Sequence, residues 1–113
     1  MTAFDTENKL GISADLLMQS APYGILVLDD ALKICGANAA ACRILNVEDV
    51  NAATGRPVSD FLDPEVFRRV MDSGEAVQEA SVHLSRDRYV ERSIAYDRGS
   101  GRLLCFMRDI TAE

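Results

Sequence analysis

The segment RLLCFMRDIT, residues 102–111, shows most clearly how this 113-residue chain folds. As an extended strand it is apolar at both sets of alternating positions, with Leu103 and Cys105 on one side and Leu104 and Phe106 on the other. A strand of this kind needs cover on both faces. We therefore expect the domain's own helices on one face of this strand and an N-terminal helix or a second subunit on the other.

The segment ends on two residues that favour helix N-caps. The side-chain oxygens of Asp109 and Thr111 can accept hydrogen bonds from the free N–H groups of a following helical turn. We interpret residues 112–113 as the start of a linker to a downstream segment that this sequence does not contain. Asp109 and Thr111 are then candidates for residues that link the domain to that segment.

Composition limits the classes of function that this chain can have. Its 48% of hydrophobic residues is enough for the core of one domain. The net charge of −6 offers no basic surface for nucleic acid or for an anionic membrane. No apolar run approaches the ~20 residues that span a bilayer, and the N-terminus lacks the features of a signal peptide. We expect a cytoplasmic domain without nucleic-acid or membrane contact.

Hydrophobic alternation and turn residues predict the order of elements along the rest of the chain. A short helix carrying Leu16 and Leu17 begins at Ser13, and residues 1–12 form a flexible or helical extension before it. The pattern predicts strands over residues 24–29, 32–37, 77–84, 88–96 and 102–110. It also predicts helices over residues 39–45 and 64–73, with short helical turns and loops over residues 46–62.

The two helices in the middle of the chain have recognisable ends. Asn38 is a predicted N-cap of the Ala-rich helix over residues 39–45. The helix over residues 64–73 has Asp63 as its predicted N-cap and Gly74 as its stop. One side of this second helix is apolar and is expected to be buried; it consists of Val66, Phe67, Val70 and Met71.

Four segments in this chain, in this order, resemble those of a PAS domain, the sensory module of bacterial signalling proteins. They are SAPYGILVLD at residues 20–29, ANAAA at 37–41, GRP at 55–57 and RDIT at 108–111. The last of these is similar to the closing signature of that family. The resemblance covers nearly the whole chain, and we place the PAS domain at residues 13–111.

This resemblance implies an α+β fold with a five-stranded antiparallel sheet of strand order 2-1-5-4-3. Helices would pack on one face of the sheet around a ligand pocket, and an N-terminal helix would support dimerisation. The candidate lining of that pocket is Phe67, Val70, Ile94, Cys105 and Met107. The candidate signal-linking residues are Asn38, Asp109 and Thr111, although an N-cap would also explain Asn38.

The cofactor is unknown from the sequence, and two cofactors of the PAS family are disfavoured. Haem needs an axial ligand such as histidine, but His83 lies in a predicted strand on the side opposite Val82 and Leu84. A covalent flavin adduct needs a reactive cysteine. The segment Cys42-Arg43-Ile44-Leu45 resembles the flavin motif only superficially and lies too early in the chain.

The remaining reactive and charged residues are interpreted as structural. We expect Cys35, Cys42 and Cys105 to pack in the core, because they lack the spacing of a metal site. We expect the basic cluster Arg86, Arg88 and Arg92 on the exterior of a strand. An alternative is that Arg92 or Arg108 faces the pocket and pairs with a carboxylate ligand.

Two functions are consistent with these residues. The first is a sensory module that binds a small ligand or a partner, forms a homodimer through the N-terminal helix and the outer sheet face, and regulates an effector on the same chain. That effector would be of a kind such as a histidine kinase or a transcription regulator. The alternative is a ligand-free architectural module for protein–protein interaction. No constellation of catalytic residues is present, so we expect no enzyme, with a thiol enzyme centred on Cys105 as a distant third class.

Overall fold

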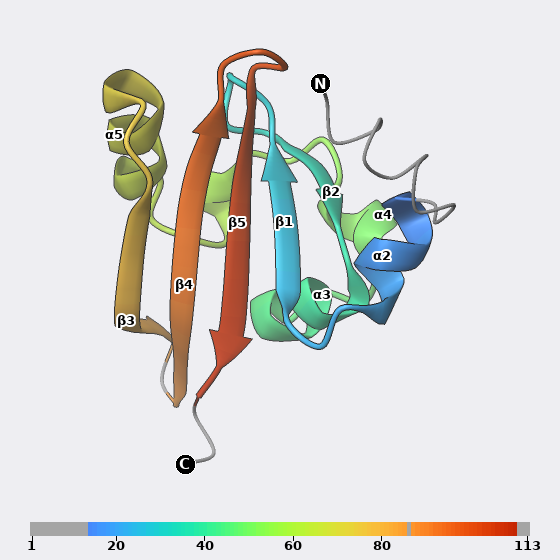
Figure 1. The fold of residues 1–113 in the computed structure, drawn as a ribbon. Helices are drawn as coiled ribbons and strands as arrows, with labels where there is room; N and C mark the ends of the chain where they lie inside the picture. The colour runs from blue at the N-terminus through green and yellow to red at the C-terminus, as the bar shows by residue number, and fades with distance from the viewer. Residues whose placement is uncertain (1–13, 86, 111–113) are drawn as a thin grey trace.

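The computed structural model describes residues 14–85 and 87–110, and its centre is a five-stranded antiparallel sheet (Figure 1). The strand order β2-β1-β5-β4-β3 confirms the predicted topology. The strands are β1 (Gly24–Leu28), β2 (Ile34–Ala37), β3 (Val77–Ser85), β4 (Arg88–Asp97) and β5 (Arg102–Asp109). The last strand, β5, therefore lies in the middle of the sheet, between β1 and β4.

The helices lie on one face of this sheet and at its β2 edge. Figure 1 shows α3, α4 and α5 on one face and α2 beside β2. Their bounds are α2 (Ala14–Ser20), α3 (Ala39–Leu45), α4 (Val50–Ala53), the 3₁₀ helix η1 (Val58–Asp60) and α5 (Glu65–Ser73). The predicted extension over residues 1–12 and the predicted cap Ser13 lie outside the described residues. No described helix has both the length and the apolar character needed to cross a membrane.

Strand β2 begins two residues later than the alternation predicts. The backbone at Leu32 has a positive φ of 62°, and its N–H donates to the carbonyl of Asp29 at 3.0 Å. The Asp29 carboxylate also accepts the N–H of Lys33 at 3.0 Å. This turn holds the chain out of the ladder until Ile34, because its backbone groups are already bonded locally.

Helix α5 has the ends that its sequence predicts, to within one residue. It begins at Glu65, and Pro64 before it is already in a helical conformation. The Asp63 carboxylate accepts the N–H of Glu65 at 3.0 Å, which is the bond expected of a capping side chain. At the other end Gly74 adopts a φ of 73°, a left-handed conformation that favours glycine, and the helix stops there.

The core lies between the inner face of the sheet and the helices α3 and α5. Leu26, Cys105 and Ile94 are neighbours across β1, β5 and β4, and each is fully buried. Helix α3 approaches β1 closely at Gly24, where an added Cβ would lie 3.1 Å from the Cα of Ala41. Alternation along each strand thus turns one set of side chains into this core and the other set away from it.

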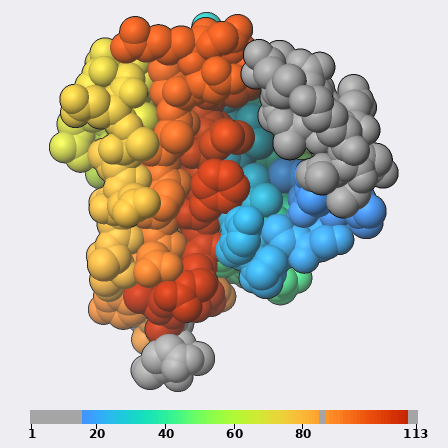
Figure 2. Space-filling model, in the orientation of Figure 1, coloured from blue at the N-terminus to red at the C-terminus, as the bar shows by residue number. Residues whose placement is uncertain are grey.

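The opposite face of the sheet carries no described helix, and we call it the open face. Its apolar side chains form in-register rows across neighbouring strands: Ile25 lies opposite Phe106, and Val27 lies opposite Leu104. Figure 2 shows β3, β4 and β5 at the surface on this side of the molecule. Phe106 is 37% exposed. The helices cover the inner face of β5, as predicted, and no described helix covers its open face.

Candidate functional site

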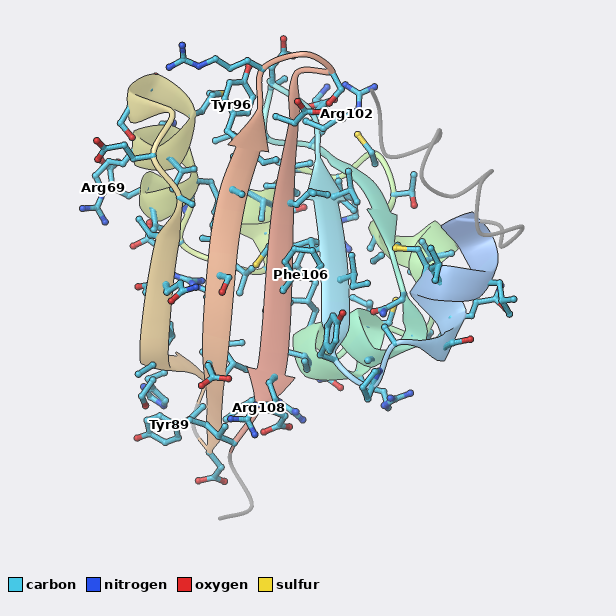
Figure 3. All side chains as sticks on the ribbon, in the orientation of Figure 1. Arg69, Tyr89, Tyr96, Arg102, Phe106 and Arg108 are labelled. Atoms are coloured by element: carbon cyan, nitrogen blue, oxygen red, sulfur yellow. The ribbon has the colours of Figure 1, made fainter. Side chains whose placement is uncertain are left out.

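The C-terminal end of β5 is bonded to the start of β4. The Asp109 carboxylate accepts a hydrogen bond from Nη1 of Arg88 at 2.5 Å. The N–H of Ile110 donates to the carbonyl of Tyr89 at 3.0 Å. Figure 3 shows Tyr89 at this end of the sheet, where the chain leaves β5. Asp109 is thus the last residue of a strand and a partner in an ion pair, whereas Thr111 lies outside the described residues.

Asn38 bonds four backbone groups from different segments with one amide side chain. Its Oδ1 accepts the N–H of Ala41 at 2.9 Å, which confirms the predicted N-cap of α3, and also accepts the N–H of Ile25 at 2.9 Å. Its Nδ2 donates to the carbonyls of Met18 at 2.9 Å and Tyr23 at 3.0 Å. Asn38 therefore connects α2, the loop before β1, β1 itself and α3. Its role in signalling stays a prediction.

The five residues predicted to line a ligand pocket lie together inside the core. Ile94 and Cys105 are paired across β4 and β5, and Phe67 and Val70 reach the same core from α5. Each of the five is at most 1% exposed, and their side chains fill the space between sheet and helix. The arrangement brings together the predicted residues, and their role in binding a ligand stays a prediction.

Arg92 is a buried cation on the inner face of β4. It is 6% exposed, so its predicted place on the exterior of the strand was wrong. It shares its side of β4 with Val90 and Ile94, and its Nε donates to Oε1 of Glu79 on β3 at 2.7 Å. Its guanidinium carbon lies 5.7 Å from the centroid of the Phe67 ring. The cross-strand carboxylate is what makes burial of this charge tolerable.

A cleft of about 460 Å³ opens beside Arg92, between residues 59–64 and strand β3. Its lining combines apolar and polar side chains, including Ser59, Leu62, Val82 and Leu84. This cleft lies on the inner side of the sheet next to the predicted pocket residues rather than among them. Arg92 also contributes to the lining of the groove on the other face of the sheet, so the cleft is the approach to this residue from the helix side.

A larger groove of about 710 Å³ crosses the open face over β3, β4 and β5. The rings of Tyr23 and Phe106 meet there edge to face, with centroids 5.8 Å apart. Nε of Arg108 donates to Oε1 of Glu91 at 3.0 Å, and this hydrogen bond holds the pKa of Glu91 below its usual value. Arg108 is thus on the open face (Figure 3), away from the cleft beside Arg92.

The other two members of the predicted basic cluster and His83 lie at the surface of the sheet or outside the described residues. Arg88 is one-third exposed through its side chain, and Arg86 lies outside the described residues. The His83 ring is exposed and stacks on Tyr89 with centroids 4.7 Å apart. In the described part of the chain, no group of histidine, cysteine and acidic residues could hold a metal ion.

Two of the three cysteines are buried, as predicted, and the third is not. Cys42 and Cys105 lie in the interior, but Cys35 on β2 is exposed. The physical reason is alternation: Ile34 faces the core, so Cys35 faces the other side of the sheet. Burial raises the pKa of the Cys105 thiol to about 12, which keeps this thiol protonated at neutral pH.

Sequence reasoning missed two residues that complete these sites, Glu79 and Tyr23. Glu79 lies opposite Arg92 in the β3–β4 hairpin, and a bulge between Glu79 and Val82 shifts the register just after it. Hairpin pairing of an acid with an arginine could have indicated this contact, had the register been known. Tyr23 meets Phe106 from the loop before β1, and no local signal in the sequence indicates that contact.

Comparisons with known proteins agree with this geometry. No match was found among curated proteins. A PAS domain of nitrogen regulation protein NR(II) from Vibrio parahaemolyticus is similar in structure, with a TM-score of 0.68 at 22% identity, over 87% of this chain and 99% of that one. A domain of a sensory box sensor histidine kinase/response regulator from Geobacter sulfurreducens has a TM-score of 0.69 at 19% identity, over 96% and 97% of the two chains.

A third similar structure is the PAS domain, in complex with ethanol, of a LuxR-family transcriptional regulator from Burkholderia thailandensis. Its TM-score is 0.62 at 14% identity, over 88% of this chain and 98% of that one. The family model described as PAS fold matches residues 14–110, which is most of the chain. With the strand order of the sheet and the helices on one of its faces, this match shows that the chain belongs to the PAS family.

Proposed function

We propose that this chain is a sensory and regulatory module that binds a small ligand or a partner, forms a homodimer and passes a signal to a C-terminal effector. The observation that supports this most is the central place of β5 in the sheet. Leu103, Cys105 and Met107 of β5 are buried in the core, and Phe106 is on the open face. A change on either face therefore acts on the strand that ends at Asp109.

The open face and the N-terminal helix are the proposed dimer surface. The face carries in-register apolar rows with an exposed aromatic pair, Tyr23 and Phe106. On α2, Leu16 and Leu17 are 51% and 48% exposed. A two-fold dimer brings the same patch of both copies together, so an apolar patch of this kind can bury itself. Exposed aromatic side chains near the centre of such a patch contribute most to its affinity.

The proteins that contain similar PAS domains support a proposal for the effector and the ligand. The Vibrio and Geobacter domains belong to a nitrogen regulation protein and to a sensor histidine kinase/response regulator. The Burkholderia domain belongs to a transcriptional regulator and is in complex with ethanol. We propose a histidine kinase or a transcription regulator as the effector and a small organic molecule as the ligand.

Native mass spectrometry of the freshly purified 113-residue chain tests both parts of this function, because it reports bound small molecules and oligomeric state together. We expect a dimer that carries additional mass from a co-purified ligand. Phe106→Glu should weaken the dimer about 30-fold, since it places two charges in an apolar interface. Val50→Glu is the matched control, because Val50 on α4 is also 37% exposed.

Three results separate the alternatives. A wild-type chain that stays monomeric at high concentration contradicts the dimer. A dimer that is equally sensitive to both substitutions places the interface elsewhere. A dimer without bound small molecule supports the second candidate, the architectural module, which the filled core around Phe67 and Cys105 favours.

A further inference from the structure

Four of the five N–H donors of the Arg92 guanidinium, those of Nη1 and Nη2, are not bonded to its partner Glu79. Its Nε is bonded to Glu79, but among the described residues no acceptor bonds its Nη1 or Nη2 groups. The described part of the chain has no fully buried polar side-chain atom without a partner. Nη groups without a protein partner therefore keep some access to solvent, although the residue as a whole is only 6% exposed, and Arg92 is one of the residues that line the cleft.

The guanidinium is held in one orientation. Glu79 bonds it from β3, and the fully buried Phe67 ring packs against it from α5. A donor group that is fixed before binding loses little conformational freedom when a ligand arrives. The free Nη1 and Nη2 groups form the planar end of the fork, which matches two oxygens of one carboxylate.

The acidic side chains around the cleft already have partners. The Asp60 carboxylate is paired with Arg56 at 3.0 Å, and that of Asp63 accepts the N–H of Glu65 at 3.0 Å. Glu79 is 35% exposed through its side chain, so water screens its charge more than it screens that of Arg92. An anion in the cleft therefore contacts the Arg92 guanidinium. The carboxylates of Asp60, Asp63 and Glu79 are each already bonded to another group of the protein.

We propose that this cleft binds a small organic carboxylate, whose two oxygens accept hydrogen bonds from Nη1 and Nη2 of Arg92. The apolar side chains of Leu62, Val82 and Leu84 suit a short hydrocarbon body, and the cleft volume of about 460 Å³ is in the range of small-molecule sites. This inference rests on the proposed sensing function and gives its ligand a chemical class.

The position of Arg92 also connects this cleft to the output strand. Arg92 lies directly opposite Met107 in the β4–β5 ladder, two residues before Asp109. Glu79, its ion-pair partner, immediately precedes the bulge of β3. A carboxylate bound to Nη1 and Nη2, next to the Nε bond to Glu79, would act on both ladders at this row of the sheet.

The test is a titration of the ¹⁵N-labelled chain with sodium benzoate, followed through the arginine side-chain signals in NMR spectra. We expect saturable shifts of the Arg92 signals, and benzamide, which has the same shape without the charge, should bind about ten-fold more weakly. Arg92→Gln should lower benzoate affinity by at least about ten-fold. Acetate and butyrate serve as smaller carboxylate probes at the same ionic strength.

Arg108→Gln is the matched control, because it breaks a similar cross-strand ion pair on the open face. This variant should leave benzoate affinity unchanged. Should Arg92→Gln fail to fold, Glu79→Gln keeps the guanidinium and an oxygen that can accept from its Nε, and it should raise affinity because it removes a negative charge next to the bound carboxylate. The proposal is overturned when none of the three carboxylates shifts the Arg92 signals at millimolar concentration, when benzamide binds as well as benzoate, or when Arg108→Gln lowers affinity as much as Arg92→Gln.

Failure of this inference is distinguishable from failure of the proposed function. A co-purified molecule without a carboxylate, found by native mass spectrometry, would support sensing and refute the carboxylate class. Benzoate binding that depends on Arg92 in a chain that forms no dimer would support the ligand class and contradict the proposed dimer.

Discussion

Asn38 satisfies more backbone groups than an N-cap requires. The bond to Ala41 is the local one that its position before a helix predicts. The other three bonds, to Met18, Tyr23 and Ile25, join segments that are 13 to 20 residues away in the chain. Because Asn38 itself is 5% exposed, its loss would leave these backbone groups with little access to water.

We expect Asn38→Ala to lower the free energy of unfolding by about 2–4 kcal/mol, because a capping bond and three further bonds are lost together. Asp49→Ala is the control: Asp49 caps α4 through the N–H of Ala52 at 3.1 Å, in an exposed position. That change should cost about 1 kcal/mol. Urea unfolding followed by circular dichroism measures both, and equal losses would contradict the clamping role of Asn38.

The end of β5 is the element whose function most depends on small interactions. Its last residue, Asp109, is joined to Arg88 by an ion pair in which both side chains are more than one-third exposed. Exposed pairs contribute about 0.2–1 kcal/mol to stability. The pair can therefore set the direction in which the chain leaves the sheet without being needed for the fold.

Asp109→Ala should uncouple the domain from its effector while lowering the free energy of unfolding by no more than about 1 kcal/mol. The effector's output in the parent protein and the urea midpoint of the domain are the two measurements. Glu91→Ala is the control, because it breaks the neighbouring Arg108–Glu91 pair by a change on β4 and leaves the residues of β5 unchanged. A domain that unfolds on Asp109→Ala would make Asp109 structural and remove it from the signalling path.

Within single elements, most of the structure could be predicted. Caps and glycine predicted α5 to within one residue, and alternation predicted which residues of β4 share a side with Val90. The start of β2 was predicted too early because the turn at Leu32 has a positive φ that alternation does not indicate. The bulge in β3 was missed because the sequence pattern does not show where the pairing of two strands changes register.

At the scale of the whole molecule, the three cysteine side chains differ in their exposure to solvent. Cys35 is exposed on the edge strand β2, Cys42 is 5% exposed, and Cys105 is fully buried in the centre of the sheet. Burial raises the pKa of all three thiols and is the largest cause for each, most strongly for Cys105. A raised pKa lowers the thiolate fraction at neutral pH, and the thiolate is the reactive form.

We therefore expect iodoacetamide at neutral pH to modify Cys35 in the native protein and to modify Cys42 and Cys105 only after unfolding in urea. Mass spectrometry of the intact chain counts the adducts. Cys35→Ser should abolish the native adduct and leave the other two available in urea. Rapid native labelling of Cys105 would contradict its burial and would restore the thiol-enzyme hypothesis.

The helices and strands were accessible from the sequence because they depend on local patterns, whereas the strand order and the family followed from the resemblance of four short segments to those of a PAS domain. Alternation with a period of two, capping residues and turn residues act within a few positions, and backbone geometry makes their consequences regular. The segment 102–111, with apolar residues at both sets of alternating positions, thus predicted a strand, and the structure has β5 over Arg102–Asp109 between β1 and β4.

The sites were accessible only from the three-dimensional arrangement. Contact between Arg92 and Glu79, or between Tyr23 and Phe106, depends on the register of segments far apart in the chain. The filling of the space around Phe67 depends on the summed volume of side chains from several elements, and the exposure of Cys35 depends on which face lacks a helix. These are properties of packing among distant residues, and no local pattern encodes them.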